Sequence, residues 1–307
     1  MDEVVSVALL KRHEIDEARW NEVISQSANS LPYGFTWYLD AVAARWNALV
    51  WGDYEAVMPL PFFTRLGIRY LYQPHYCQQL GIFFRHEWSD STAIALLRKA
   101  IHRYPFVQYQ LHAGCGSLTK MFRLQVRKNL ILNVSAGIDT IRKRYSENHK
   151  RNLTKAARHG LVYLTTKDLH KFVEFYELNV DREKENLKEK HIRHFKKLCD
   201  ALQVFSQYTV AVAGTAEGEW LAAVLLLYHA SRVIALVNCS GAEGKRKGAS
   251  HFLFDNIIRS ESGHTKWLDF EGSSIPSVAR FYEGFGAEPE IYYQIKRSPM
   301  QYILPGF

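Results

Sequence analysis

Runs of apolar residues bounded by turn residues in the first part of the chain are typical of β-strands. Residues 48–63 give two strands around a Gly-Asp turn, residues 69–84 form a second strand-rich stretch after a Leu-Gly turn, and residues 106–114 form another strand. Residues 89–104 open with a helix N-cap candidate, Ser89, and then place apolar residues at helical spacing. This order predicts an α/β domain.

The second half repeats the order with different residues, and a charged region separates the halves. The expected elements of the second half are three strands over 207–240, a Gly- and Lys-rich loop, a helix over 250–262, a strand over 265–272, a helix over 275–287 and a strand over 290–297. Before them come a basic stretch at 148–160 and a long helix at 168–201 with charges of both signs four residues apart, as on a solvated face. The pattern predicts two tandem domains, 1–128 and 129–307, with a helical insert at 140–202. Each domain is expected to be a mixed, mostly antiparallel sheet flanked by helices.

Composition narrows the class of protein. The 307 residues are 47% hydrophobic, which excludes a disordered or collagen-like chain. Four widely spaced cysteines without a C-x-x-C pair indicate reduced thiols and a cytoplasmic location, and no signal peptide is expected. The longest apolar run, residues 220–228, is less than half of the ~20 residues that span a bilayer, and reads as a buried strand. The thirteen histidines show no H-x-x-x-H or H-E-x-x-H spacing, so no metal site is expected.

The net charge of +8 is concentrated in two places. Residues 142–158 hold seven Lys and Arg against one acidic residue, Glu147, and Lys245, Arg246 and Lys247 follow the strand that ends near Asn238. A glycine- and cation-rich loop that enters a helix N-terminus offers backbone N–H groups and the positive end of the helix dipole to an anion. The loop is therefore a candidate phosphate site, and a solvated basic hairpin is the alternative.

The end of the second half resembles the GNAT acyltransferase superfamily. Its closing pattern of a small residue, two positions, Tyr, Glu and a Gly-Phe variant is similar to Ala279, Tyr282, Glu283, Phe285 and Gly286. The R-K-G-A-S stretch at 246–250 looks like a degenerate form of that superfamily's Arg/Gln-x-x-Gly-x-Gly/Ala pyrophosphate loop, with Lys245 as an alternative first position.

The whole chain also resembles the FemABX-like branch, in which two GNAT domains are fused. The basic segment at 150–163 is similar to that branch's Lys/Arg-rich helix, and L-D-F-E-G-S-S at 268–274 is similar to its Asp-Phe-Gly-Gly strand end. Two departures favour acyl-CoA over aminoacyl-tRNA as the donor. Glu271 stands where a glycine is common, and Tyr282 stands where the peptidoglycan-bridge enzymes often have Lys after Phe.

The resemblance implies how acyl-CoA, such as acetyl-CoA, would be bound and used. The pantetheine would lie along the strand that ends at Val237 and Asn238, and Tyr282 would be the general acid, since an unperturbed Tyr pKa of ~10 suits donation to a thiolate near 8.5. The pyrophosphate would lie on Gly244, Lys245, Arg246, Lys247, Gly248, Ala249 and Ser250. A structural role for Tyr282 is the alternative.

Two carboxylates are candidates for the general base. Asp269 and Glu271 alternate with apolar residues, so both are expected on one side of a strand, with Glu271 at the strand end as the better base. A solvated pair or a cap of the next helix is the alternative.

The first half has no Gly-Lys run, so it is not expected to bind CoA. Its polar and aromatic side chains could contact the acceptor in an interdomain cleft, or be ordinary surface and core residues. They are Trp37, Tyr38, Gln73, His75 and Tyr76.

These observations predict a bacterial-type acyltransferase that moves an acyl group from acyl-CoA to an amine or hydroxyl of a small molecule or cell-envelope precursor. One alternative is a FemABX-type transferase of cell-wall synthesis that uses aminoacyl-tRNA, which the basic segment at 142–158 favours. Another is a degenerate, non-catalytic GNAT pair that serves as a binding module, which the imperfect R-K-G-A-S loop favours.

Overall fold

The computed structural model describes residues 7–183, 185–271 and 275–298, and the chain divides into two compact units. The first unit contains the chain up to Arg127 together with the residues from Ile291 onward, and the second is Lys128–Glu290. The sequence places the closing strand in the second domain, whereas residues 293–297 pair with residues 107–111 of the first unit. The chain therefore returns to the first unit at its end.

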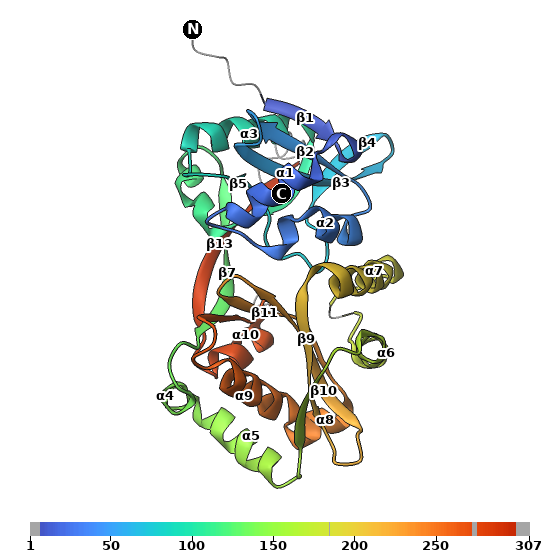
Figure 1. Ribbon diagram of the computed structural model, residues 1–307, viewed down its shortest axis with the longest axis vertical. Helices are drawn as coiled ribbons and strands as arrows, with labels where there is room; N and C mark the ends of the chain where they lie inside the picture. Colours follow the sequence, from blue (N-terminus) through green and yellow to red (C-terminus); the bar gives the residue numbers. More distant parts are fainter. Residues whose placement is uncertain (1–6, 184, 272–274, 299–307) are drawn as a thin grey trace. The chain divides into compact units, whose positions relative to one another are not determined.

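The first unit is a mixed sheet with helices (Figure 1). The strand order is β1-β2-β3-β4-β6-β13, where β4 and β6 are parallel and the other neighbours are antiparallel, and β5 pairs with β3. The predicted helix at 89–104 is confirmed as α3, and the Ser89 hydroxyl accepts a hydrogen bond from the Thr92 N–H as its N-cap. The elements are β1 (Val7–Lys11), η1 (Arg12–Glu14), α1 (Glu17–Gln26), η2 (Pro32–Gly34), α2 (Thr36–Val42), β2 (Trp46–Trp51), β3 (Ala56–Arg65), β4 (Ile68–Tyr72), β5 (Phe83–Phe84), α3 (Asp90–Arg103), β6 (Phe106–Leu111), η3 (Ala113–Lys120) and β13 (Glu288–Arg297).

The second unit has the strand order β7-β12-β11-β10-β9-β8. Only β11 and β12 run parallel in this order. The elements are β7 (Leu124–Asn133), α4 (Ile138–Arg142), α5 (Glu147–Ala157), β8 (Val162–Thr166), α6 (Leu169–Asn179), α7 (Glu189–Phe205), β9 (Gln207–Gly214), β10 (Trp220–His229), β11 (Arg232–Ser240), α8 (Ala242–Lys247), α9 (Ala249–Glu261), β12 (Trp267–Asp269) and α10 (Pro276–Glu283).

Helices cover both faces of the central strands of this sheet. Leu226 and Ala235 belong to a buried cluster with residues of α9 and α10, while α6 and α7 pack against β9, β10 and β11. The predicted buried strand at 220–228 is confirmed as β10, whose first eight residues are all buried. No helix in the described ranges is long and apolar enough to cross a membrane.

The insert predicted at 140–202 differs from its expected form. The single long helix at 168–201 is two helices, α6 and α7, and strand β8 precedes them and pairs with β9. The basic stretch at 148–160 forms α5 and ends near Gly160, which has a φ of 59° and so adopts the left-handed conformation that glycine tolerates.

Candidate functional site

Strands β11 and β12 separate after a short parallel contact. Residues 232–234 of β11 pair with residues 267–269 of β12, where β12 ends, and the Phe270 N–H instead donates to the Leu130 carbonyl of β7. On its other side β11 stays paired with β10 as far as Ser240. Within the described residues, no strand pairs with the β12 side of residues 235–240, which we call the open edge. Its main-chain groups are available to a ligand that carries amides.

A β-bulge lies in the open edge. Val237 is opposite Leu225 and Ala235 is opposite Leu226, so Leu236 has no partner residue on β10. A bulge bends its strand and redirects the side chains around it, and bulges are enriched next to active sites. The predicted pantetheine-binding residues Val237 and Asn238 follow this bulge directly.

Tyr282 of α10 reaches the open edge from the core. It is 2% exposed and stacks on Phe270, with ring centroids 4.5 Å apart and an interplanar angle of 21°, and Phe254 meets it edge-on. The side-chain amide of Asn238 donates to its phenol oxygen at 2.9 Å. The predicted acid and the predicted pantetheine strand are therefore in direct contact.

The surroundings of Tyr282 keep its phenol protonated. Burial raises its pKa most, the hydrogen bond from Asn238 opposes this, and the carboxylates of Glu185 and Glu271 raise it further. The phenol oxygen accepts from Asn238, which leaves the phenol proton for donation to a ligand. The raised pKa also makes Tyr282 a weaker acid than a tyrosine in water.

Glu271 has a strained backbone. Its φ is 49°, in the left-handed region that costs an ordinary L-residue about 1–2 kcal/mol and costs glycine almost nothing. Glu271 is 8% exposed, and its main-chain N–H donates to the Asp269 carboxylate at 3.1 Å. Strain of this kind persists where the surrounding structure enforces it and is frequent at active sites. The residues that follow it in the L-D-F-E-G-S-S motif, 272–274, lie outside the described residues.

Asp269 differs from its expected placement. Its carboxylate is 2.6 Å from the Arg232 guanidinium and accepts from the Asn129 amide at 2.8 Å, and Arg232 also pairs with Glu290 at 2.8 Å. The strand ends at Asp269 and Glu271 adopts a left-handed conformation, so strand alternation no longer determines on which side the Glu271 side chain lies. Asp269 is held in a buried ion-pair network, which gives its role as a base no support.

The predicted glycine-rich loop is a short helix, α8. Glu243 pairs with Arg246 and with Lys247, the latter at 3.3 Å. A Cβ on Gly244 would collide with the Leu221 carbonyl oxygen of β10, so this glycine allows α8 to pack on the sheet. Lys245 is exposed. The cations expected to hold pyrophosphate are therefore partly neutralised, and Gly244 serves packing.

The N-terminus of α9 keeps the properties of an anion site. Gly248 precedes it with a φ of 73° and supplies no side-chain cap, and the first main-chain bond within the helix runs from the Phe252 N–H to the Gly248 carbonyl. The N–H groups of buried Ala249 and half-buried Ser250 belong to the first turn, where helical N–H groups have no partner in the helix. Of the residues predicted to hold the pyrophosphate, those at this helix end therefore still present donor groups suited to an anion.

Helix α5 lies beside that helix end. A Cβ on Gly248 would be 3.2 Å from the Asn152 carbonyl of α5. Of the basic residues at 142–158, Arg142, Arg144 and Lys150 are in ion pairs with acidic residues. The others form no ion pair within the described residues, and all are exposed: Lys143, Arg151, Lys155 and Arg158. An exposed cationic surface suits a polyanion.

The residues predicted in the first unit gather around the loop that follows β4. The Tyr38 hydroxyl donates to the Tyr76 carbonyl, Trp37 packs edge-on against Tyr38 at 5.3 Å, and His75 packs against Tyr76 at 6.2 Å. The Gln73 amide donates to the Cys77 carbonyl at 2.7 Å and accepts from the Gln110 N–H at 3.0 Å. Gln73 therefore fastens the loop to β6, and contact with an acceptor stays a prediction for this group.

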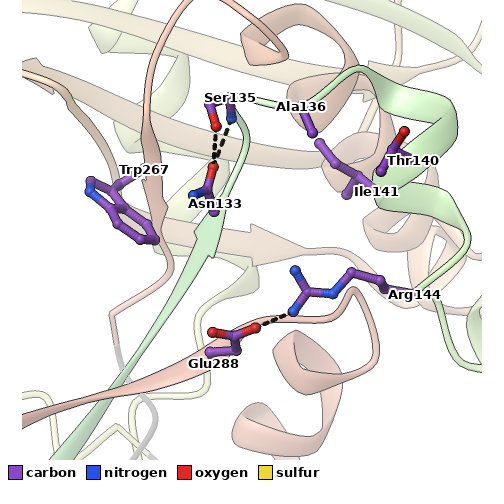
Figure 2. A pocket seen from close by; sticks show the side chains of 8 residues that line it. All are labelled: Asn133, Ser135, Ala136, Thr140, Ile141, Arg144, Trp267 and Glu288. Carbon is purple, nitrogen blue, oxygen red and sulfur yellow. Dashed lines mark hydrogen bonds and ion pairs between the residues drawn. The ribbon is translucent and has the colours of Figure 1, made fainter.

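A separate hollow of about 270 Å³ lies in the second unit at the start of β12 (Figure 2). Trp267 forms one wall and is paired with Arg232, at the end of β11 opposite to Asn238, so the hollow is distinct from the open edge. Arg144 pairs with Glu288 at its rim, and the Asn133 side chain accepts from Ser135 (Figure 2). The residues that line the hollow share no sequence motif that could have predicted it. Among the described residues, no group of three or more His, Cys, Asp or Glu could hold a metal ion.

No model of a known protein family and no curated protein matches the chain. Among solved structures, FemX is similar over 97% of this chain and 99% of its own, with a TM-score of 0.66 and 12% sequence identity. The C-terminal domain of a protein described as a lysylphosphatidylglycerol synthetase, from Agrobacterium fabrum, is similar over 93% of this chain and 92% of its own, with a TM-score of 0.58 and 12% identity. L-PGS from Bacillus licheniformis is similar over 94% and 93%, with a TM-score of 0.57 and 13% identity. The chain therefore shares its fold with FemX and with the other two structures, and the predicted fold class is confirmed.

Proposed function

We propose that the chain is an acyltransferase whose second unit holds an acyl-CoA donor along the open edge of β11. The observation that carries this proposal is the separation of β11 from β12, together with the hydrogen bond that Asn238 of β11 donates to the Tyr282 phenol. The likeness to FemX over nearly the whole length of both chains supports a transferase. We take the acceptor to be an amine or hydroxyl of a small molecule or a cell-envelope precursor.

The donor would use groups that the fold already presents. Pantetheine amides would pair with the main chain at Val237 and Asn238, as an added strand does at a sheet edge. The pyrophosphate would lie at the N-terminus of α9, on the N–H groups of Ala249 and Ser250, with exposed Lys245 nearby. In this placement the N-terminus of α9, and not the lysine-rich stretch at 245–247, supplies most of the positive potential that would hold the pyrophosphate.

The chemistry would divide between two side chains. Glu271, which is buried and has a strained backbone, would accept the proton of the attacking amine or hydroxyl. Tyr282 would give its proton to the departing sulfur, while Asn238 holds the phenol oxygen in position. The raised pKa of Tyr282 requires the sulfur to be a strong base when it leaves, as a thiolate shielded from water is.

Aminoacyl-tRNA is the second candidate donor, and the unpaired cations of α5 favour it. Arg151 and Lys155 lie on the helix that packs beside the N-terminus of α9, and Arg158 follows its last residue. The aminoacylated end of a tRNA could therefore approach the same open edge. Each phosphate that these cations contact would make tRNA binding weaker at higher salt.

Thermal unfolding with acetyl-CoA, longer acyl-CoAs or CoA tests the proposal. A ligand at about 100 times its Kd should stabilise the chain by about 2.7 kcal/mol. The variant Glu271→Gln should keep this stabilisation and lose acyl transfer. An absence of stabilisation by every acyl-CoA, with salt-sensitive tRNA binding that weakens when Arg151, Lys155 and Arg158 are changed to Ala, would assign the second donor. Binding of acyl-CoA without transfer to any acceptor would point to the non-catalytic module.

A further inference from the structure

The β3–β4 hairpin of the first unit ends in an exposed leucine. Arg65 pairs with Ile68, so Leu66 and Gly67 form a two-residue turn, and Leu66 is 92% exposed. The last three residues of β3 and the first of β4 are exposed as well, so the tip extends away from the buried core of this unit (Figure 1).

The turn places this leucine in an unfavourable conformation. Leu66 has a φ of 52° and Gly67 a φ of 75°, the positive values found in the two-residue turns where Asn-Gly is preferred. A bulky residue in this region is an outlier, since its Cβ crowds the backbone. Leu66 has almost no contact in the fold that would offset the strain. An exposed residue whose conformation lowers the stability of the fold is a candidate for contact with another molecule.

One face of the hairpin continues the apolar surface. Phe63 and Ile68 are each 40% exposed, and Phe63 stacks on its cross-strand partner Tyr70 at 4.9 Å with nearly parallel rings. Tyr70 in turn stacks on Phe106 of the neighbouring strand at 4.5 Å. Of these rings, that of Tyr70 combines an apolar body with a polar hydroxyl, which favours the boundary between hydrocarbon and headgroups.

The charge of the hairpin is positive. The sequence contains no Asp or Glu from residue 56 to residue 86. Arg65 lies beside Leu66 and Arg69 lies on β4, with its guanidinium 5.9 Å from the Phe62 ring centre. Neither arginine forms an ion pair with any of the described residues. The hairpin therefore combines an apolar tip, partly exposed aromatic rings and two unpaired cations.

We propose that this hairpin docks on an anionic lipid surface, with Leu66 inserted among the acyl chains. Arg65 and Arg69 would contact lipid phosphates, and Phe63 and Ile68 would lie at the headgroup boundary. A peripheral site of this kind needs no membrane-spanning helix. The proposal does not depend on the donor used by the second unit.

Co-sedimentation of the full chain with lipid vesicles tests the proposal. We expect binding to vesicles of equal parts phosphatidylcholine and phosphatidylglycerol, weaker binding to phosphatidylcholine alone, and release at high salt. Leu66→Asn should weaken binding by about tenfold or more, because a leucine no longer enters the hydrocarbon. The same variant should unfold at an equal or higher temperature than the parent, since asparagine tolerates positive φ. Arg65→Gln should weaken binding by about fivefold.

Leu178→Asn is the matched control. Leu178 is 84% exposed on α6 of the second unit, and its replacement should leave vesicle binding unchanged. The proposal is overturned if the parent chain sediments with neither kind of vesicle, or if Leu66→Asn binds as tightly as the parent. Failure to bind lipid together with capture of a protein through the hairpin would assign the surface to a protein partner instead.

Discussion

Replacing Tyr282 with Phe separates a catalytic phenol from a structural one. The variant keeps the ring that stacks on Phe270 at 4.5 Å and removes only the hydroxyl that accepts from Asn238 at 2.9 Å. One neutral hydrogen bond contributes about 1 kcal/mol, and Asn238 is exposed, so its amide regains water. The unfolding free energy should therefore fall by about 1 kcal/mol or less.

The effect on turnover should be much larger. Loss of a general acid lowers kcat by about 10²–10⁴-fold, whereas KM for the acyl donor should hardly change. The assay is steady-state acyl transfer, with urea unfolding of the same preparations. Tyr228→Phe is the control, since it removes a phenol hydroxyl that donates to Glu261 at 3.1 Å, at the end of β10 remote from Asn238. A Tyr282→Phe variant with parental kcat would remove Tyr282 from the mechanism and leave it a packing role.

Further predictions concern the fold of the second unit. Arg232→Leu should lower the unfolding free energy, measured in urea, by about 3–5 kcal/mol, because Asp269 is left buried without its cation. A loss of less than about 1 kcal/mol would contradict a structural role for this ion-pair network. Gly244→Ala should cost about 1–3 kcal/mol through its clash with β10, while Gly137→Ala, which has open space around it, should cost little; equal losses would contradict the packing role. Burial lowers the pKa of His251 to about 4, below its ordinary value of 6.5, so the unfolded chain binds the proton more readily. This contribution to stability is present above pH ~6.5 and should fall by about 1–2 kcal/mol between pH 7 and pH 5, and a His251→Gln variant that keeps the same pH slope in urea titrations would contradict it.

The order of strands and helices could be predicted because the hydrophobic periodicity of the chain is regular. The run at 220–228 is apolar at every position because β10 is covered on both faces, and Ser89 marks a helix start that the structure shows as an N-cap. Helix α8 could not be predicted in the same way. Gly241 and Gly248 flank a six-residue stretch that looks like a loop, and the helix there depends on tertiary contact between Gly244 and β10.

The site was harder to predict than the fold. Strand alternation predicted that Asp269 and Glu271 face one side, but the strand ends at Asp269 and Glu271 is left-handed, so the alternation does not apply to Glu271. Arg232 pairs with Asp269 and Glu290, and Asn129 donates to Asp269; these residues lie far apart in the sequence, so no spacing links them. Tyr282 lies close to Asn238 and Glu271 because β11 and β12 separate there. The resemblance in sequence implied roles for these residues, but the hydrogen bond between Asn238 and Tyr282 could be found only in the structure.

Hydrogen–deuterium exchange of the full chain with and without acetyl-CoA tests the central claim most directly, because it reports on the main-chain N–H groups of the open edge. The proposal predicts slower exchange in peptides that cover residues 235–240 and the first turn of α9, with no change in β9. Binding of acetyl-CoA that leaves both of these segments unprotected, or protects only other segments, would contradict the placement of the donor.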